Sequence, residues 1–287
     1  MHDRPLVRVL RAAFRAWPFE HGRGWLLRLA QVLLRPPITY QVGKCTRIQS
    51  DLAEYQSRWT FMRLHERDES FQHSLRLLPP HFVALDIGAN VGVWSLLAIE
   101  AHPDGCVHAF EPVPALATQL RDHVAMNGIR PGGIVTNVTA VAAETGVAAF
   151  FVNHTTNTGA SSLYHRPVDS NEISVDVITL DAYAARAGLD RIDMLKVDVE
   201  GAEISVFTGA RRLLSRDDAP AVFFEIDARL CGKAGTTTTD VKRLLIGHGY
   251  TIFRCRGGAL VPVALDEPHR HEDLFALKPP HIDRFGR

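Results

Sequence analysis

The chain has 287 residues, 46% of them hydrophobic, which is enough for one large α/β domain with additional elements. Lys plus Arg and Asp plus Glu both number 32, so no overall field attracts nucleic acid or an anionic membrane. No apolar run reaches the ~18 residues of a membrane span, and the basic N-terminus is a poor signal peptide. The four scattered cysteines are typical of buried or half-buried free thiols. We therefore expect a cytoplasmic protein.

The first segment, Leu6 to Leu34, has helical periodicity, with apolar residues on one face and Arg8, Arg11 and Arg15 on the other. One interpretation, which we favour, is a helical cap over the main domain or over its substrate cleft. The alternative is peripheral contact with a membrane, because basic amphipathic helices bind anionic lipid.

From residue 79 onward, short apolar runs alternate with amphipathic stretches, which predicts βαβ units and a mainly parallel sheet. The predicted strands are Phe82–Ile87, Cys106–Phe110, Ile134–Val138, Val147–Val152, Ile173–Val177, Met194–Val199, Val222–Ile226, Tyr250–Arg254 and Asp273–Leu277. The predicted helices are Asp68–Leu78, Val93–Glu100, Ala115–Met126, Leu180–Ala187, Ala202–Leu214 and Thr239–His248. Val147–Val152 and Ile173–Val177 are expected to pair antiparallel. We therefore predict one α/β domain over residues 66–280, a helical extension over 1–65 and a tail over 281–287.

The strongest local motif runs from Asp86 to Gly92, directly after a predicted strand and before a predicted helix. Its glycines allow a tight turn and close approach of a ligand, and the free N–H groups of the helix can bind a polar group. Because Asp86 replaces the first glycine of GxGxxG, the motif suits a ligand with positive charge, such as the amino end of S-adenosylmethionine, better than a pyrophosphate. Glycine turns of this kind also occur for steric reasons alone.

Acidic residues end three of the predicted strands. Glu111 follows the second strand, where a carboxylate accepts hydrogen bonds from ribose hydroxyls, although a surface glutamate before Pro112 is the alternative. Lys196, Asp198 and Glu200 lie in or just after a strand that is otherwise apolar, and Glu225 ends its neighbour. Buried charges are costly unless paired or functional, so Lys196 is expected either to pair with a carboxylate or to act in the site.

The runs LDIGANVGVWSLL, VHAFEPVP, IDMLKVDVEGAEISVFTGARRLL and VFFEI, in this order, resemble the FkbM-type methyltransferase family. The resemblance spans about Glu69 to Arg254 and implies a Rossmann-like class I methyltransferase fold, with a mostly parallel seven-stranded sheet and helices on both faces. It further implies that S-adenosylmethionine is the cofactor. The residues implied to bind it are Asp86, Gly88, Ala89, Asn90 and Gly92 for the methionine part, Glu111 with Pro112 for the ribose, and Asn137, Ala140 and Val141 for the adenine.

The predicted reaction is methylation of a hydroxyl on a small molecule, since similar proteins methylate polyketides, sugars and glycans. Asp198 or Glu200 is expected to remove the hydroxyl proton, and His154 is a further candidate base in the polar loop before Ser161, Ser162 and Tyr164. Alternatively, Asp198, Glu200 and Glu225 could hold Mg²⁺. An N- or carboxyl-methyltransferase, a nicotinamide oxidoreductase and a non-catalytic binding module are the remaining alternatives.

Overall fold

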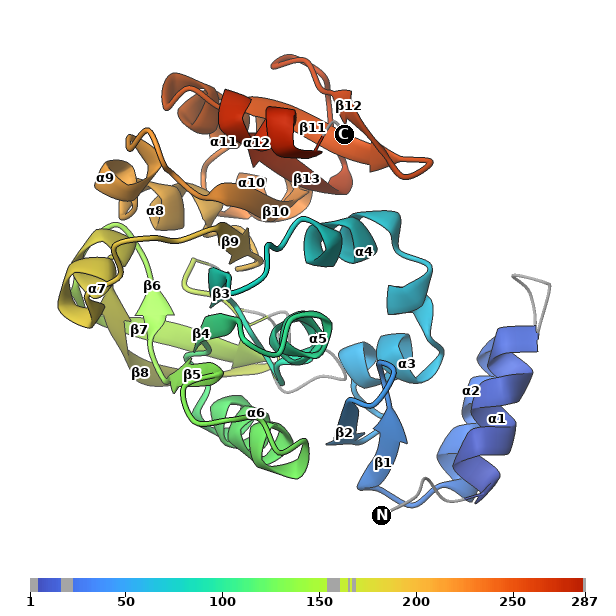
Figure 1. The fold of residues 1–287 in the computed structure, drawn as a ribbon. Coiled ribbons are helices and arrows are strands. Elements are labelled where there is room, and N and C mark those ends of the chain that lie inside the picture. Colours follow the sequence, from blue (N-terminus) through green and yellow to red (C-terminus); the bar gives the residue numbers. More distant parts are fainter. Residues whose placement is uncertain (1–4, 17–22, 154–160, 165, 167–168, 286–287) are drawn as a thin grey trace.

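The central sheet has eight strands in the described part of this computed structural model, which covers residues 5–16, 23–153, 161–164, 166 and 169–285 (Figure 1). In spatial order the strands are β12 (Ala259–Pro262), β11 (Thr251–Arg256), β13 (His271–Leu277), β10 (Ala221–Asp227), β9 (Met194–Val197), β3 (Val83–Ile87), β4 (Cys106–Phe110) and β5 (Ile134–Asn137). The five strands from β10 to β5 are parallel, and β13 lies antiparallel between β10 and β11.

The sheet thus has one strand more than the seven that we predict. The additional strand, β12, pairs with β11 through a two-residue turn at Gly257 and Gly258. Both glycines have positive φ, 60° and 76°, which is the backbone geometry of a type I′ hairpin.

Helices cover both faces of the sheet because successive strand residues point to opposite sides. Ala84 and Phe223 belong to one core, and Leu85 and Phe224 belong to the other. The first face carries α4 (Glu69–Arg76), α5 (Val93–Ala101), α6 (Pro114–Met126) and α12 (Pro279–Phe285). The second face carries α7 (Leu180–Ala187), α8 (Glu203–Thr208), α9 (Arg211–Leu214), α10 (Ala228–Lys233) and α11 (Thr238–Gly247).

Two predicted segments differ from the structure. The helix predicted over Ala202–Leu214 is divided into α8 and α9 around Gly209, whose backbone lies against the carbonyl of Ala142; a β-carbon there would come within 2.2 Å of that oxygen. The predicted C-terminal tail is largely the helix α12.

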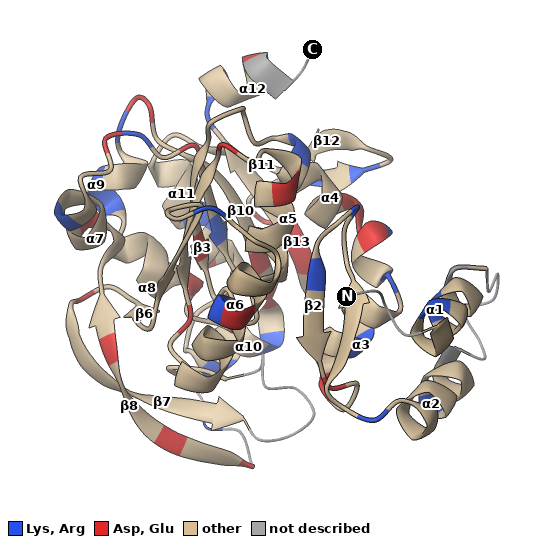
Figure 2. Cartoon of the chain, turned by 60° about the horizontal axis from the view of Figure 1, so that its bottom comes forward, with Lys and Arg blue, Asp and Glu red and all other residues tan. Residues whose placement is uncertain are grey.

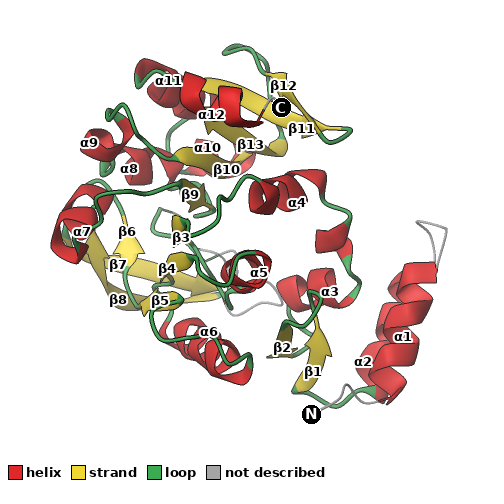
Figure 3. Cartoon of the chain, in the orientation of Figure 1, coloured by secondary structure: helices red, strands yellow, loops and turns green. Residues whose placement is uncertain are grey.

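A separate three-stranded sheet lies beside the main one (Figure 3). It contains β7 (Gly146–Asn153) and β8 (Ser170–Ile178), which pair antiparallel as predicted, and β6 (Ala140–Val141), which runs parallel to β8. Because β6 follows directly after β5, this sheet begins at the edge of the main one and places β7 next to the carboxyl ends of the parallel strands.

The N-terminal extension is not wholly helical. The predicted helical segment divides into α1 (Pro5–Ala16) and α2 (Arg23–Leu33), which contact each other. They are followed by an antiparallel hairpin of β1 (Ile38–Gln41) and β2 (Arg47–Ser50), by α3 (Tyr55–Phe61) and by a 3-10 turn, η1 (Leu64–Glu66). The hairpin is bonded to the main domain, since the Glu100 carboxylate of α5 accepts the N–H of Thr46 at 2.7 Å.

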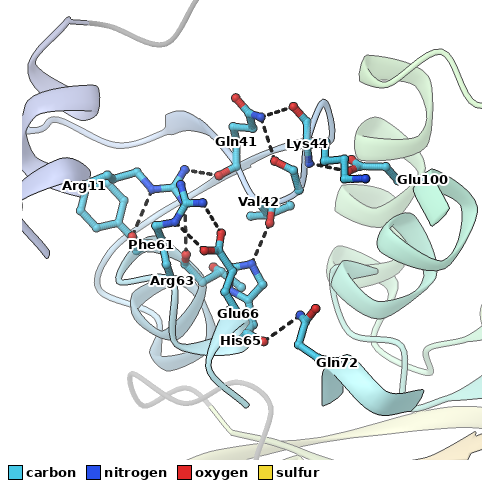
Figure 4. A network of polar contacts seen from close by, with 12 residues as sticks. Arg11, Gln41, Val42, Lys44, Phe61, Arg63, His65, Glu66, Gln72 and Glu100 are labelled. Atoms are coloured by element: carbon cyan, nitrogen blue, oxygen red, sulfur yellow. Dashed lines mark hydrogen bonds and ion pairs between the residues drawn. The ribbon is translucent and has the colours of Figure 1, made fainter. Parts of the chain in front are cut away.

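A buried arginine joins α1 to the rest of the extension (Figure 4). Arg11 donates from Nε to the carbonyl of Phe61 at 3.1 Å and from a terminal nitrogen to the carbonyl of Gln41. Its guanidinium also lies 4.9 Å from the centre of the Tyr40 ring, a cation–π distance. This one side chain therefore connects α1, β1 and the end of α3.

No described helix combines the length and the apolar sequence that a bilayer crossing requires. All four cysteines are free, but Cys45 is exposed, against our expectation that every thiol is at least half-buried.

We expect Arg11→Ala to lower the free energy of unfolding by about 2–4 kcal/mol, because the buried carbonyls of Phe61 and Gln41 lose their donor. Urea denaturation followed by circular dichroism measures the change. The control is Arg8→Ala on the exposed side of α1, expected within ~0.5 kcal/mol of wild type. Equal stability of the two variants would contradict the role given to Arg11.

Candidate active site

The floor of the site is an ion-pair network between two strand ends. Lys196, at the third position of β9, has its Nζ 3.1 Å from Oδ1 of Asp86 and 3.4 Å from Oδ2 of Asp198, and donates to the carbonyl of Gly88 at 2.9 Å. Burial lowers the pKa of the Lys196 ammonium, but the Asp86 and Asp198 carboxylates raise it by more, so Lys196 stays charged. The fully buried Asp86 also accepts the hydroxyl of Ser95 at 2.6 Å.

The glycine loop lies directly against the end of β9. A β-carbon on Gly88, whose φ is +77°, would be 1.8 Å from the carbonyl oxygen of Asp198, so only glycine fits this position. In the loop itself, which precedes the helix whose N–H groups we predict to be free, Gly88 and Ala89 both donate to the carbonyl of Phe110, at 3.1 and 2.9 Å. The loop therefore offers a ligand its shape and close approach, while these two amides are already bonded within the protein.

Glu111, just after β4, fixes the next turn of the loop. Its carboxylate accepts the N–H of Asn90 and the N–H of Val113, both at 2.9 Å. Asn90 presents its N–H from a left-handed backbone, with φ at 51°. Burial raises the pKa of Glu111 to about 7, although these two backbone donors lower it. Each carboxylate oxygen keeps a second lone pair for a ligand hydroxyl.

One cavity of about 840 Å³ opens above this network. Its wall contains most of the predicted cofactor residues, namely Gly88, Ala89, Asn90, Glu111, Pro112, Ala140 and Val141, and the predicted catalytic or metal residues Asp198, Glu200 and Glu225. Three predicted cofactor residues are not in this wall. Asp86 lies beneath it with Lys196, Gly92 packs its backbone against Leu120, and Asn137 donates to the carbonyls of Ala109 and Val135.

Three carboxylates meet on the far side of the loop, with one oxygen from each of Asp198, Glu200 and Glu225 within 4.8 Å of the others. Burial, followed by the charges of Asp198 and Glu225, raises the pKa of Glu200 to about 9. Glu200 has a left-handed backbone, with φ at 55°, which costs about 1 kcal/mol and is a feature of functional sites. The Asp198 side chain is 43% exposed and faces the cavity.

The antiparallel strand β13 adds two residues that sequence reasoning missed. Asp273 lies opposite Glu225 in the β10–β13 register, and burial together with Glu225 raises its pKa well above the ordinary value. His271 Nε2 lies 2.5 Å from Oε1 of Glu225, and this hydrogen bond raises the pKa of His271 to about 9. His271 is therefore a cation at neutral pH and no general base. Knowing that β13 pairs with β10 would have placed both residues beside Glu225.

The opposite wall comes from the N-terminal extension and from the β7–β8 region. Tyr55 and Trp59, one turn apart on α3, line the cavity together with Phe71 of α4. Across from them Ser161 lines the cavity, and the hydroxyl of Ser162 donates to the backbone carbonyl of Glu200 at 3.3 Å. His154, the third predicted catalytic residue, lies outside the described residues.

Comparison with known proteins gives a family match over residues 86–252, to the family described as "Methyltransferase FkbM domain". A 31-O-demethyl-FK506 methyltransferase, FkbM, from Streptomyces tacrolimicus is 29% identical over an alignment of 209 residues, which covers 63% of this chain and 76% of that protein. Methyltransferase 1 from Beauveria bassiana is 24% identical over 61% of this chain and 74% of its own length. The crystal structure of methyltransferase FkbM from Methylobacillus flagellatus KT matches with a TM-score of 0.45 and 17% identity, over 78% of this chain and 55% of that one.

We expect Glu111→Gln to weaken binding of S-adenosylhomocysteine roughly 10- to 100-fold, because the amide accepts fewer hydrogen bonds from the ribose and carries no charge. Isothermal titration calorimetry measures the affinity, and Glu172→Gln on the exposed face of β8 is the control.

The pKa of about 7 at Glu111 gives the same experiment a second readout. Ribose hydroxyls donate to the ionised carboxylate, so wild-type affinity should rise between about pH 6 and pH 8 as Glu111 loses its proton. In Glu111→Gln this rise should be absent. A variant with wild-type affinity and the wild-type pH profile would remove Glu111 from the binding site.

Proposed function

Because the chain belongs to the FkbM methyltransferase domain family and is thus an S-adenosylmethionine-dependent methyltransferase, we propose that it methylates a hydroxyl group of a small molecule. The convergence of Asp198, Glu200 and Glu225 in the cavity is the observation that carries the proposal. A hydroxyl must lose a proton when it is methylated, and a group of carboxylates provides a place for that proton.

The same carboxylates argue against the other acceptor classes. A carboxylate acceptor would be repelled by the carboxylate of Asp198, which is partly exposed to the cavity. A protonated amine would be attracted by the negative charge. The same charge would stabilise the protonated form, whose nitrogen has no lone pair to attack the methyl group. A phosphodiester chain would meet the same repulsion, in keeping with the lack of any basic field in the sequence.

The residues present in the cavity fit S-adenosylmethionine. Glu111 offers buried carboxylate oxygens to the ribose, and the absence of a side chain at Gly88 lets the backbone approach the ligand. The cavity volume of about 840 Å³ lies in the range of small-molecule sites and leaves space for an acceptor beside the cofactor. When bound, the cofactor supplies a methyl group on a positively charged sulfur, and the nearby carboxylates complement that charge.

We assign the proton-accepting role to Asp198. Its side chain is partly exposed to the cavity, and Lys196 Nζ, 3.4 Å from one oxygen, fixes its orientation from below. Glu200, with its pKa of about 9, carries a proton at neutral pH in the ligand-free protein and can donate a hydrogen bond to the acceptor oxygen. Alignment of the acceptor oxygen with the methyl group, which these two side chains enforce, supplies much of the rate.

A bound Mg²⁺ is the second candidate for activating the hydroxyl. The oxygens of Asp198, Glu200 and Glu225 are close enough to share one cation, and such hard ligands suit Mg²⁺, which would lower the pKa of a coordinated hydroxyl. Two neighbouring cations weaken this alternative, because Lys196 contacts Asp198 and His271 contacts Glu225. Both would repel a divalent ion, so we favour direct proton transfer to Asp198.

We expect Asp198→Asn to lower the rate of methyl transfer about 100- to 10,000-fold, because asparagine accepts no proton. Transfer of a labelled methyl group from S-adenosylmethionine to a panel of hydroxylated polyketides and sugars measures the rate. Asp176→Asn, on the exposed part of β8, is the matched control and should keep the wild-type rate. Affinity for S-adenosylhomocysteine, whose sulfur is uncharged, should stay within about threefold of wild type in both variants, since asparagine keeps the shape of the aspartate side chain. A wild-type rate in Asp198→Asn would contradict the assignment.

Exhaustive treatment with EDTA distinguishes the two modes of activation. Direct proton transfer predicts an unchanged rate after chelation, because no step then depends on a divalent ion. A loss of activity that added Mg²⁺ restores would establish the metal alternative instead.

A further inference from the structure

The helical hairpin of α1 and α2 takes no part in the active-site cavity. The residues of the cavity wall begin at Tyr55, so the predicted cap over the substrate cleft is wrong for this hairpin. Instead, α1 and α2 pack on the N-terminal part of the core through the buried side chains Val7, Leu10, Phe14, Leu26 and Ala30, and Leu34 directly after α2 is buried in the same core. The two helices lie at the edge of the molecule (Figure 1), and described side chains on their opposite faces are exposed.

Those uncovered faces are unusually apolar. Trp25 and Val32, two turns apart on α2, are 65% and 80% exposed, and Val9 on α1 is 64% exposed. Leu6 and Leu33 are exposed as well. An exposed tryptophan between exposed aliphatic residues is the composition of a binding surface rather than of a solvated helix.

The charged residues of this surface are all basic. Arg8 on α1, Arg28 on α2 and Arg35 just after α2 are exposed. Neither helix contains an Asp or Glu, and Figure 2 shows only basic charge on the pair. On α2, Trp25, Arg28 and Val32 follow the three- and four-residue spacing that places side chains on one face of a helix.

We propose that the outer face of the α1–α2 hairpin binds the surface of an anionic membrane. Trp25, Val9 and Val32 insert at the level of the lipid headgroups, where an amphipathic aromatic ring is favoured, and the arginines pair with lipid phosphates and carboxylates. The buried side of α1 is held in place by Arg11, which donates hydrogen bonds to the carbonyls of Gln41 and Phe61. These bonds fix the position of α1 on the rest of the N-terminal extension.

A second copy of the chain fits this face less well. In a two-fold dimer the same surface contributes from both copies, so Arg8, Arg28 and Arg35 of one would face those of the other. No acidic residue of either helix is present to pair with them. Anionic lipid supplies both the negative charge and the apolar layer that the surface lacks.

The test is flotation of the full chain with phosphatidylcholine vesicles, with and without phosphatidylserine. We expect binding only to the phosphatidylserine vesicles, and loss of most of it when salt is raised from about 0.1 M to about 1 M, which shortens the screening length from ~10 to ~3 Å. The variant R8Q/R28Q/R35Q should bind roughly 100-fold more weakly, at about fivefold for each charge removed. The variant W25Q/V32Q should bind roughly tenfold more weakly, because it loses the inserted apolar surface.

Matched controls keep the same changes away from the hairpin. R121Q/R211Q/R256Q removes three exposed arginines from α6, α9 and β11, and V147Q/I246Q replaces two exposed aliphatic residues on β7 and α11. Both controls should bind vesicles as the wild type does, and circular dichroism should confirm that every variant is folded.

Several outcomes would overturn the proposal. Wild-type protein that stays unbound with phosphatidylserine vesicles would do so, as would equal binding by R8Q/R28Q/R35Q and its control. A dimer seen by light scattering that W25Q/V32Q converts to a monomer would assign the face to a second copy instead. None of these measurements uses methyl transfer, so their results are independent of whether the proposed activity is correct.

Discussion

The buried ammonium of Lys196 holds the active site together. It contacts Asp86 on β3, Asp198 after β9 and the carbonyl of Gly88 between them, so three segments meet at one charge. Removing that charge would leave the fully buried Asp86 without a cation, a loss that typically costs about 3–5 kcal/mol. The position of the glycine loop against Asp198, and the orientation of the Asp198 carboxylate, both follow from this contact.

Above Lys196 the site has more acidic groups than one lysine neutralises. Burial raises the pKa values of Glu111, Glu200, Glu225 and Asp273, so part of the group is uncharged in the free protein. A cationic sulfur in the cavity would lower these pKa values and favour the ionised forms. Cofactor binding would therefore increase the ionised fraction of these carboxylates, which is the form that can take a proton.

Local sequence pattern predicted the parallel strands, most of the helices and the polar residues at strand ends, because a strand end and its loop are set by neighbouring residues. The pattern did not decide whether Lys196 forms an ion pair with a carboxylate or acts in the site. The structure shows an ion pair with Asp86. Long-range contacts were missed. His271 and Asp273 join the site only through the antiparallel register of β13, and Tyr55 and Trp59 only through the packing of α3. The hydrogen bonds of the Gly88 and Ala89 amides were missed for the same reason, because their acceptor, the carbonyl of Phe110, comes from another strand.

We propose that one cavity brings the reactive sulfur of the cofactor to the carboxylates of Asp198, Glu200 and Glu225. A crystal structure of the protein with S-adenosylhomocysteine tests it most directly. We expect the ribose hydroxyls to be bonded to Glu111 and the sulfur to be directed toward the three carboxylates, with space for an acceptor between them. A nucleoside bound away from Glu111, or a sulfur directed away from Asp198, would contradict it.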